Sequence, residues 1–432
     1  MQIYGWGRYP RVDAKIESPA SVEDCVQIVL NHESIIPRGL ARSYGDSSLA
    51  HCVLETKEIK SSHDFEEATG TLRCSAGTTF DEILRLYVPN GWFLPVTPGT
   101  RFITVGGAIA SDVHGKNHHL DGTFSNHVTE IDLLLGNGEI VKASPSLRSD
   151  LFQATCGGMG LTGVILSATF KLIPITSSRM IQTTIKLPDL ESTLKAFEEK
   201  ANSHYSVAWI DSLATGKNLG RSLMILGSHA TDKVFSYGRK ELLSIPFDLP
   251  SATLNNFTVR MFNSLYYQRV RTTGTRVIPL EQFFYPLDFI GNWNRLYGKQ
   301  GLLQYQFVIP KRTGFEGIKS ILSVIAESGV TSFLAVLKLF GQGNHQYLSF
   351  PFEGYTLALD FKAIPPSLSL LEKLDDMLVG FGGRIYLSKD ARMPESVFKS
   401  GYPNWRQFED VRQRYHAIGK FSSLQSQRLG LQ

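Results

Sequence analysis

The sequence lacks the features that mark several classes of protein. It has only four cysteines, Cys25, Cys52, Cys74 and Cys156, and no CxxC spacing, so we expect reduced thiols rather than a disulfide framework. No apolar run reaches the roughly 18 residues that a membrane-spanning helix needs. The first ten residues also lack the apolar core of a signal peptide. The sequence therefore predicts a cytoplasmic protein, or one that is peripheral at the inner membrane.

A large charge of either sign is also missing. The net charge is +4, and no lysine or arginine run could follow a phosphate backbone, which argues against nucleic acid as a partner. Charged residues make up 19% of the chain and apolar residues 42%, as in ordinary globular proteins. A chain of 432 residues is too long for one core, so we expect two domains.

Local patterns predict alternating helices and strands in the first part of the chain. Ser21 precedes an apolar-periodic segment and is typical of a helix cap, and Thr79-Phe-Asp-Glu82 is a capping-box pattern. Asn137-Gly138 between two apolar runs predicts a hairpin. The run from Val164 alternates in the manner of a strand and is closed by Pro174.

The second part of the chain has longer and more aromatic strand patterns. They begin near residue 179, include 206–211 and 304–310, and alternate with helical segments such as 317–327. This pattern predicts a large antiparallel sheet, so that both parts belong to the α+β class. After Gly382-Gly383 we expect a basic strand that carries Lys389, and then a final helix over about 405–415.

Three glycine-rich segments carry the strongest functional signal. They are Arg38-Gly-Leu-Ala-Arg-Ser-Tyr-Gly-Asp, the stretch 97–119 with Gly106 and Gly107 at a helix start, and Cys156-Gly-Gly-Met-Gly-Leu-Thr-Gly. Glycine permits close approach of the backbone to a ligand, and bare amides at a helix start attract phosphate. Arginines and hydroxyls in the first segment suit a pyrophosphate. The segments together predict a dinucleotide cofactor, whereas each alone would be explained by a tight turn.

A nicotinamide-binding Rossmann fold is disfavoured. Gly158, Gly160 and Gly163 match GxGxxG, but a Rossmann fingerprint follows a strand, opens a helix and has an acid about 20 residues later. Here a helical pattern precedes the glycines and a strand pattern follows them. The nearest later acid is Asp189, so the context is inverted.

The three segments resemble those of the vanillyl-alcohol-oxidase type of flavoenzyme, whose FAD domain is of the p-cresol-methylhydroxylase (PCMH) type. The resemblance covers nearly the whole chain and includes 303–308, 336–341 and 382–390. It is closest to members that oxidise a lipid-phosphate-linked ribose. It implies an FAD-binding domain over 1–178, a substrate-binding domain over 179–383 built on the large sheet, and a C-terminal return over 384–432.

The resemblance also implies an activity. It indicates an FAD-dependent oxidoreductase acting on CH–OH groups, which oxidises the 2′-hydroxyl of a polyprenylphosphoryl-β-D-ribofuranose to the 2′-keto sugar. This step is the first half of an epimerisation to the arabinose form, a precursor of cell-wall arabinan. An NAD(P)H-dependent short-chain reductase would be the epimerase partner, and a membrane surface a further contact.

Residues are assigned to FAD by the same resemblance. Arg42 stands where relatives with covalently attached FAD often carry a histidine, and arginine cannot form that bond, so non-covalent FAD is expected. The implied FAD contacts are Arg38, Gly39, Leu40, Ala41, Arg42, Ser43, Tyr44, Gly99, Thr100, Gly106, Gly107, Ser111, His114, Gly115, Asn117, Cys156, Gly157, Gly160, Gly163, Val164 and Tyr386.

Substrate and catalytic residues follow in the same way. Gln304 and Gln306 share one face of a strand, because strand side chains alternate. A cation at Lys389 would stabilise negative charge on the flavin or bind the 2-hydroxyl, and Lys389 and Tyr44 are alternative bases. The implied catalytic residues are Lys389, Tyr44 and His114, and the implied substrate contacts are Lys116, Trp209, Gln304, Gln306, Val336, Lys338, Phe340, Thr356, Ala358 and Lys389.

Several alternatives remain open at this stage. Mycobacterial relatives carry Asn and Cys at the positions of Thr356 and Ala358, which leaves the sugar and lipid undefined. A second enzymatic hypothesis is an FAD-dependent oxidase or dehydrogenase of a free alditol or aldonolactone, and a third is a non-catalytic flavin-binding subunit. A polyprenyl substrate needs an apolar entrance, for which the aromatic stretch 260–268 is a candidate. No metal site is expected at His118 and His119, because no acidic or cysteine partner stands at ligand spacing.

Overall fold

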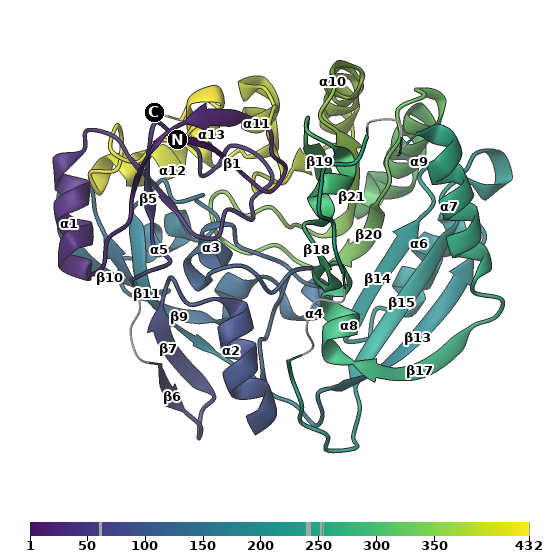
Figure 1. Ribbon diagram of the computed structural model, residues 1–432, viewed down its shortest axis with the longest axis horizontal. Helices are drawn as coiled ribbons and strands as arrows, with labels where there is room; N and C mark the ends of the chain where they lie inside the picture. The colour runs from purple at the N-terminus through teal and green to yellow at the C-terminus, as the bar shows by residue number, and fades with distance from the viewer. Residues whose placement is uncertain (60–62, 239–242, 251–252, 254, 432) are drawn as a thin grey trace.

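The computed structural model describes residues 1–59, 63–238, 243–250, 253 and 255–431. Figure 1 shows two lobes side by side: one contains the first part of the chain together with the C-terminal helices, and the other contains the middle of the chain. Within the part that the structure describes, no helix combines the length and apolarity needed to cross a membrane. All four cysteines are free thiols, as predicted.

The first lobe is built on small sheets. A parallel sheet has the strand order β3–β5–β4, and an antiparallel sheet has the order β10–β9–β11–β7–β6. The strands of the lobe are β1 (Gln2–Tyr4), β2 (Arg11–Asp13), β3 (Lys15–Glu17), β4 (Ile36–Arg38), β5 (Cys52–Glu55), β6 (Asp64–Glu66), β7 (Thr71–Ser75), β8 (Trp92–Phe93), β9 (Val128–Leu134), β10 (Ile140–Ala143), β11 (Val164–Lys171) and β12 (Ile173–Pro174).

The predicted helix caps of this lobe are confirmed. The Ser21 hydroxyl accepts a hydrogen bond from the Asp24 amide, and Thr79 and Glu82 form a reciprocal capping box. The Asn137-Gly138 hairpin joins β9 and β10, and a helix precedes the third glycine segment while a strand follows it. The helices are α1 (Val22–Asn31), α2 (Phe80–Tyr87), α3 (Val105–Ala110), α4 (His118–Asp121) and α5 (Ser149–Thr155).

The second lobe contains the predicted large antiparallel sheet. Its strand order is β17–β13–β15–β14–β20–β21–β19–β22, and every neighbouring pair is antiparallel. The strands are β13 (Arg179–Leu187), β14 (Tyr205–Ile210), β15 (Ser222–His229), β17 (Gly274–Pro279), β19 (Leu302–Pro310), β20 (Ala335–Phe340), β21 (Gly354–Lys362) and β22 (Arg384–Ile385). Outside the sheet, β16 (Leu243–Ser244) pairs with β18 (Ile290–Gly291).

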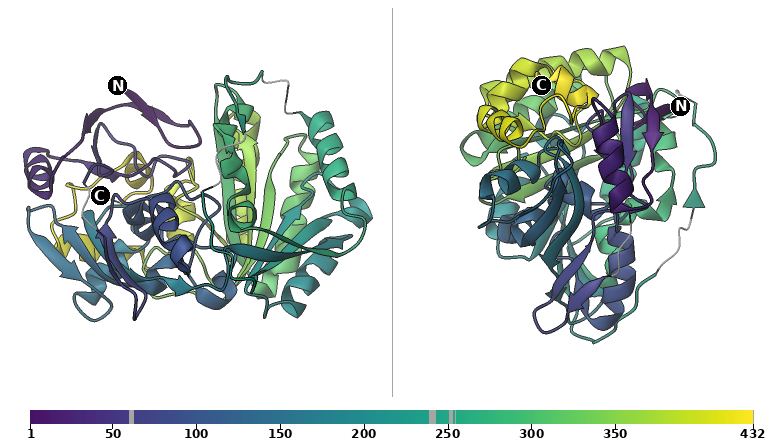
Figure 2. Two further views of the ribbon diagram at one scale, coloured as in Figure 1. Left: turned by 60° about the horizontal axis from the view of Figure 1, so that its bottom comes forward. Right: turned by 90° about the vertical axis from the view of Figure 1, so that its left-hand side faces the viewer.

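Helices cover one face of this sheet and leave the other toward the first lobe (Figure 2). The covering helices are α6 (Leu190–Glu199), α9 (Lys311–Glu327) and α10 (Pro365–Gly380). Two further helices, α7 (Asn256–Gln268) and α8 (Leu280–Phe284), come from the long connection between β15 and β19. The open face therefore presents its alternate side chains to the junction of the lobes.

The C-terminal segment returns to the first lobe through α11 (Glu395–Gly401), α12 (Trp405–Arg414) and α13 (Leu424–Arg428). The Ile35 amide donates to the Lys420 carbonyl (2.8 Å), and the Leu424 amide donates to the Leu49 carbonyl (2.7 Å). The prediction that the helix near 405–415 is the last one is wrong, because α13 follows it. That five-residue helix is too short and polar to produce a periodic pattern.

The predicted strand at Lys389 is also wrong. The strand β22 ends at Ile385, and Lys389 lies in a turn in which its amide donates to the Tyr386 carbonyl (2.9 Å). A turn allows consecutive side chains to leave in different directions, so that Lys389 lines a cavity while Asp390 is buried. Strand alternation alone does not predict this placement.

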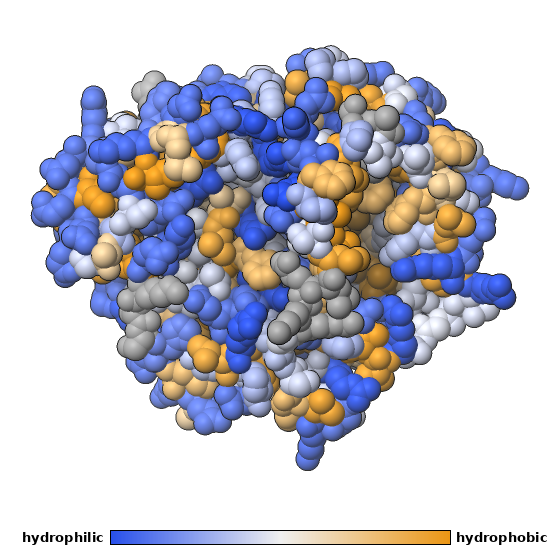
Figure 3. Space-filling model, in the orientation of Figure 1, coloured by the Kyte–Doolittle hydropathy of each residue, from blue (hydrophilic) through white to orange (hydrophobic). Residues whose placement is uncertain are grey.

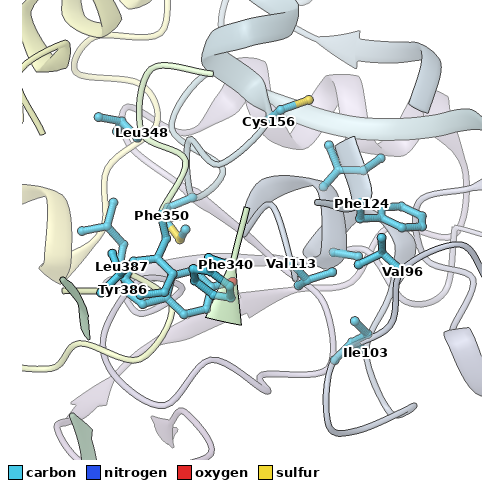
Figure 4. Close-up of a cluster of buried hydrophobic side chains, with 14 of the residues drawn as sticks. Val96, Ile103, Val113, Phe124, Cys156, Phe340, Leu348, Phe350, Tyr386 and Leu387 are labelled. Atoms are coloured by element: carbon cyan, nitrogen blue, oxygen red, sulfur yellow. The ribbon is translucent and has the colours of Figure 1, made fainter. Parts of the chain in front are cut away.

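A hydrophobic core runs through both lobes (Figure 4). Val96, Ile103 and Phe124 come from the first lobe, whereas Phe340 and Phe350 come from the second part of the chain. Each buried side chain of this size contributes roughly 1.5–3 kcal/mol. The two lobes are therefore packed against each other through a shared hydrophobic core.

A buried ion pair connects the first glycine segment to the C-terminal return. The Arg428 guanidinium donates to Asp46 Oδ1 and to Asp390 Oδ2, both at 2.8 Å. Next to this ion pair, Gly45 lies against the backbone of Asp390, so closely that a Cβ atom on Gly45 would stand 1.8 Å from the Asp390 carbonyl oxygen. Asp390 directly follows Lys389, so this pair fixes the turn that carries the lysine.

Replacing Arg428 by Ala should lower the free energy of unfolding by about 3–5 kcal/mol, because two buried carboxylates lose their counter-charge. Urea unfolding followed by circular dichroism measures this loss. Arg414→Ala is the matched control: it breaks a more exposed pair with Asp150 and should cost about 1 kcal/mol or less. Equal losses in the two variants would contradict the role given to Arg428.

Candidate active site

A cavity of about 850 Å³ lies between the lobes. It is lined by the glycine segments of the first lobe and by the open face of the large sheet. This volume is toward the upper end of ordinary ligand sites, which measure about 300–1,000 Å³. The structure brings all but six of the sequence-predicted site residues to the cavity wall; those six are Asn117, Cys156, Gly157, Val164, Phe340 and Thr356.

Two of these six residues contact side chains that line the cavity. Thr356 accepts a hydrogen bond from Gln306 (3.3 Å), and the Phe340 ring stands edge-on to His114 with the ring centroids 4.8 Å apart. Asn117 donates to the Pro95 carbonyl (2.8 Å). The other three are buried in the first lobe, where the Gly157 amide donates to the Ile109 carbonyl (3.0 Å).

The first glycine segment presents unpaired amides. It leaves β4 at Arg38 and lines the cavity from Gly39 to Tyr44. Within residues 1–59, 63–238, 243–250, 253 and 255–431, the amides of Gly39, Leu40 and Ala41 have no protein acceptor. Arg38 donates through Nη2 to the Tyr4 carbonyl (2.8 Å), whereas its Nη1 is buried without a partner among the same residues.

The helix start at Gly106 differs from the prediction. The amides of Val105 and Gly106 donate to the carbonyls of Thr78 and Ala76, both at 2.8 Å, and the Gly107 amide donates to Thr104 Oγ1 at 3.1 Å. They are therefore not the bare amides that the sequence suggested. The start of α3 is packed against the turn before α2, and this contact satisfies its donors.

One row of cross-strand neighbours forms part of the cavity wall. Trp209 pairs with Val336, Val336 with Ala358, and Ala358 with Gln306, across β14, β20, β21 and β19. All four line the cavity, and Gln304 lines it two residues before Gln306. The predicted common face of the two glutamines is thus confirmed. The row therefore has an apolar part, Trp209, Val336 and Ala358, beside the side-chain amides of Gln304 and Gln306.

His114 is held as a neutral ring. The Gln306 amide nitrogen donates to His114 Nε2 (2.9 Å), which leaves the ring proton on Nδ1. Phe340, Phe350 and Tyr386 surround the ring, and Figure 4 shows these three aromatics together. Burial, and then the charge of nearby lysines, lowers the pKa of His114 well below its usual range. Nδ1 is buried and has no partner among the residues described.

Three lysines line the same cavity. The Lys389 Nζ stands 4.0 Å from the centroid of the Tyr44 ring, and the Lys116 Nζ donates to the Phe284 carbonyl (3.0 Å). Burial lowers the pKa of Lys116 and of Lys389 to about 8. The pKa of Lys338 falls to about 7, because burial is joined by repulsion from the other two lysines. Three ammonium groups thus share one enclosed space.

Asp360 is a site residue that the sequence analysis missed. It is fully buried and accepts a hydrogen bond at Oδ1 from Gln304 Nε2 (2.5 Å), while its second oxygen has no partner in the described part of the chain. Burial raises its pKa to about 7, and its charge raises the pKa of Lys389. Alternation along β21 places Asp360 on the face of Thr356 and Ala358, so the strand pattern could have found it.

The charge of the cavity wall is strongly one-sided. Asp288 is the only acidic residue among those that line the cavity in the described structure. The basic residues are Arg38, Arg42, Lys116, Arg269, Arg276, Lys338 and Lys389. A wall of this charge favours anionic ligands, because buried cations need nearby negative charge.

The residues present fit a dinucleotide cofactor. Arg38 Nη1 and the free amides of the 39–41 loop are donors for phosphate oxygens, and His114 Nδ1 is a buried donor for a polar ring atom. A Cβ on Gly99, which also lines the cavity, would meet no atom within 4 Å, so this side of the cavity is open to a bulky ligand. These features match FAD, with its pyrophosphate and polar ring system.

The histidines next to the site make protein contacts. His118 packs on Phe340 with the ring centroids 4.4 Å apart, and burial lowers its pKa to about 3. The ring of His119 contacts the Ser203 carbonyl through Nε2 (2.9 Å). Elsewhere, the ligand atoms of Glu17, His32 and Cys52 come close together, but the Lys15 ammonium already contacts Glu17 at 2.6 Å.

Comparison with known proteins agrees with this geometry. Residues 10–144 match the family model of the FAD binding domain. The chain is 37% identical, over its whole length and 97% of the relative, to the decaprenylphosphoryl-β-D-ribose oxidase of Mycolicibacterium smegmatis. It is 30% identical, over 82% of this chain and the whole relative, to an uncharacterised protein of Streptomyces coelicolor. A putative D-arabinono-1,4-lactone oxidase of Neurospora crassa is 27% identical over 33% of this chain and 24% of the relative.

The full-length match and the FAD-binding domain define the class of the protein. The α+β architecture of PCMH type and the FAD cofactor expected from the glycine segments are confirmed. The match includes the strands of the second half that carry Gln304, Gln306 and Lys338. The chain is an FAD-dependent oxidoreductase and belongs to the decaprenylphosphoryl-β-D-ribose oxidase family.

Proposed function

We propose that this enzyme oxidises the 2′-hydroxyl of a polyprenylphosphoryl-β-D-ribofuranose to the 2′-keto sugar. The observation that carries the proposal is the cavity wall, in which seven basic residues face one acidic residue. A phosphodiester-linked sugar supplies the missing negative charge, whereas a free alditol or aldonolactone does not. The name of the Mycolicibacterium smegmatis relative points to the same substrate class.

The two lobes have different tasks in this proposal. Residues 1–178 and 384–432 hold FAD, and residues 179–383 present the substrate. The FAD contacts are the cavity-lining residues of the three glycine segments, together with Tyr386. Attachment is non-covalent, since Arg42 stands at the predicted attachment position and its guanidinium stacks on Trp6 at 4.2 Å from the ring centroid.

Substrate binding divides along the wall. Lys116 and Lys338 hold the phosphate, because their ammonium groups are enclosed and have little opposing charge. Gln304 and Gln306 hold the sugar hydroxyls from adjacent positions on β19. Trp209 and Val336 continue the same wall as an apolar surface toward the lipid.

Oxidation of an alcohol removes a proton from oxygen and a hydride from carbon. Bound FAD supplies the hydride acceptor. Burial raises the pKa of Tyr44 well above its usual range, so its hydroxyl keeps its proton and acts as a donor. Lys389 has a pKa of about 8, and we assign it two successive tasks: its neutral amine accepts the hydroxyl proton, and the ammonium formed in this way stabilises the negative charge that develops at the reacting centre.

The product defines the partner. A 2′-keto sugar becomes the arabinose form only when a hydride is delivered to the opposite face, and an NAD(P)H-dependent short-chain reductase supplies it. The lipid chain of the substrate requires contact with a membrane, so we propose a peripheral location, with the rest of the chain in the cytoplasm or at the inner membrane surface.

Anaerobic mixing with candidate substrates tests the proposal. A short-chain polyprenylphosphoryl ribose should bleach the flavin absorbance, whereas xylitol and a sugar lactone should not, because neither carries the phosphate that the lysines bind. Bleaching by the polyol or lactone alone would move the function to a small-sugar oxidase. A flavin that no alcohol bleaches would make the protein a binding subunit.

Lys389→Ala should retain FAD and lower kcat by about 10²–10³-fold, the usual effect of removing one electrostatic contact to the reacting centre. Stopped-flow bleaching measures kcat, and flavin released by acid measures FAD content. Lys142→Ala, at a surface ion pair outside the cavity, is the control and should change neither. Wild-type bleaching in Lys389→Ala would remove this residue from the mechanism.

Affinity for the substrate phosphate should fall as the pH rises through about 7 to 8. The lysines of the cavity are charged below their lowered pKa values and neutral above them, and Lys338 loses its proton first. The dissociation constant of a short-chain polyprenyl phosphate, followed by flavin absorbance, measures this effect. Lys338→Arg keeps its charge throughout this range and should flatten the profile. An unchanged profile in that variant would contradict the assignment of Lys338.

A further inference from the structure

An apolar stripe on α7 faces away from the protein. Phe257, Met261 and Leu265 are spaced four residues apart and are 75%, 52% and 63% exposed. Val259 and Asn263, on the opposite side of the helix, are 1% and 2% exposed and anchor it to the lobe. Residues at this spacing share one helix face. A contiguous row of large exposed apolar side chains marks an interaction surface rather than an ordinary exterior.

This stripe continues into the cavity. Phe262 and Tyr266 of the same helix line the cavity wall, and Phe262 is also exposed to solvent. The centroid of the Tyr266 ring lies 4.8 Å from that of Trp209, which belongs to the row of cross-strand neighbours in the cavity wall. An unbroken series of aromatic side chains therefore leads from the outside of α7 to the inner wall.

A second exposed apolar side chain lies next to a segment of the cavity wall. Leu243 of β16 is 71% exposed, and β16 pairs with β18, whose Ile290 lines the cavity. Figure 3 shows hydrophobic side chains beside the hollow on the lobe formed by the large sheet. The entrance thus has apolar side chains on more than one side.

The charged residues of the segment that contains α7 have a single sign. Residues 249–280 contain four arginines and no aspartate or glutamate. Arg260, Arg269, Arg271 and Arg276 are all exposed. An amphipathic helix with an apolar face and surrounding cations is the type that lies in the interface of an anionic bilayer, with its apolar face about 5–10 Å deep. An acidic protein partner would match the arginines but would leave the apolar stripe without its counterpart.

We propose that the Phe257, Met261 and Leu265 face of α7 binds this protein to an anionic lipid membrane. The arginines lie at the headgroups, and the polyprenyl chain of a substrate passes from the bilayer along Phe262 and Tyr266 into the cavity. The route of the lipid chain rests on the proposed function. The attachment to the membrane rests only on the exposed helix and its charges.

Sedimentation of the FAD-loaded full chain with vesicles tests the attachment. Binding is expected to vesicles of phosphatidylcholine mixed with phosphatidylglycerol, and to be weaker for phosphatidylcholine alone. The triple variant Phe257→Ser, Met261→Ser, Leu265→Ser should bind at least tenfold more weakly. The matched control, Leu30→Ser, Leu86→Ser, Leu147→Ser, removes three exposed leucines from the first lobe and should bind as the wild type does.

A variant that removes two arginines tests the electrostatic contribution to membrane binding. Arg260→Gln with Arg271→Gln should weaken binding to the anionic vesicles by about tenfold or more, since each arginine at such a surface contributes on the order of 1 kcal/mol. Added salt should reduce the difference, because it screens the headgroups. Unchanged vesicle binding in both the apolar and the charge variants would overturn the proposal.

Activity separates this inference from the proposed function. The triple α7 variant should bleach with a short-chain phosphoribose in solution at the wild-type rate, but should lose most turnover of a long-chain substrate embedded in vesicles. If no substrate is oxidised but the triple α7 variant loses vesicle binding and the control variant does not, the membrane-binding surface is supported and the proposed oxidase function is wrong. A wild-type protein that binds no vesicles overturns the surface, even if oxidation occurs. Sedimentation as a dimer that the triple variant abolishes would identify a second copy as the occupant and would also overturn it.

Discussion

The burial of three lysines in one enclosed cavity is the constraint on which the rest of the site depends. Lowering the pKa of a lysine from 10.5 to about 8 corresponds to about 3 kcal/mol of opposition to its charged form. Lys338, which has the other two as neighbours, is opposed more strongly. The fold alone does not offset this cost, because the only carboxylate that the described residues contribute to the cavity wall is Asp288, with Asp360 behind Gln304. Bound anions offset this cost. The uncompensated positive charge of the cavity therefore indicates that its ligands are anionic.

The lysines meet because three distant parts of the chain are held rigidly against one another. Lys116 follows α3 in the first lobe, Lys338 belongs to β20, and Lys389 lies in the turn after β22. The hydrogen bond between Gln306 and His114 joins the two lobes at the cavity, and Arg428 fixes the turn through Asp390. Since His114 is neutral, it adds no fourth cation to the group. It can therefore serve as a donor at a place where a charged imidazolium would increase the repulsion.

The sequence predicted those features that depend on local periodicity. Helix caps at Ser21 and Thr79, the antiparallel sheet and the common face of Gln304 and Gln306 all follow from spacing along one segment. Prediction from the sequence failed where the role of a residue depends on a partner that is distant along the chain. The donors of α3 are satisfied by the turn before α2, and the role of Asp360 depends on Lys389 and Gln304, which come from other elements. The wall residues themselves were reached through a family resemblance, because no single-strand pattern brings Trp209 beside Val336.

The arrangement of the wall selects an amphiphilic substrate by its geometry. The amides of Gln304 and Gln306 lie at one end of the cross-strand row, whereas Trp209, Tyr266 and Phe262 continue its other end as an aromatic surface to the outside. A small polyol would leave that surface in contact with water and the lysines without an anion. A sugar phosphate on a long lipid satisfies both halves, since its charged head lies among the lysines and its chain covers the aromatics. The same chain must come from a bilayer, which accounts for an exposed apolar helix at the entrance without any separate function for it.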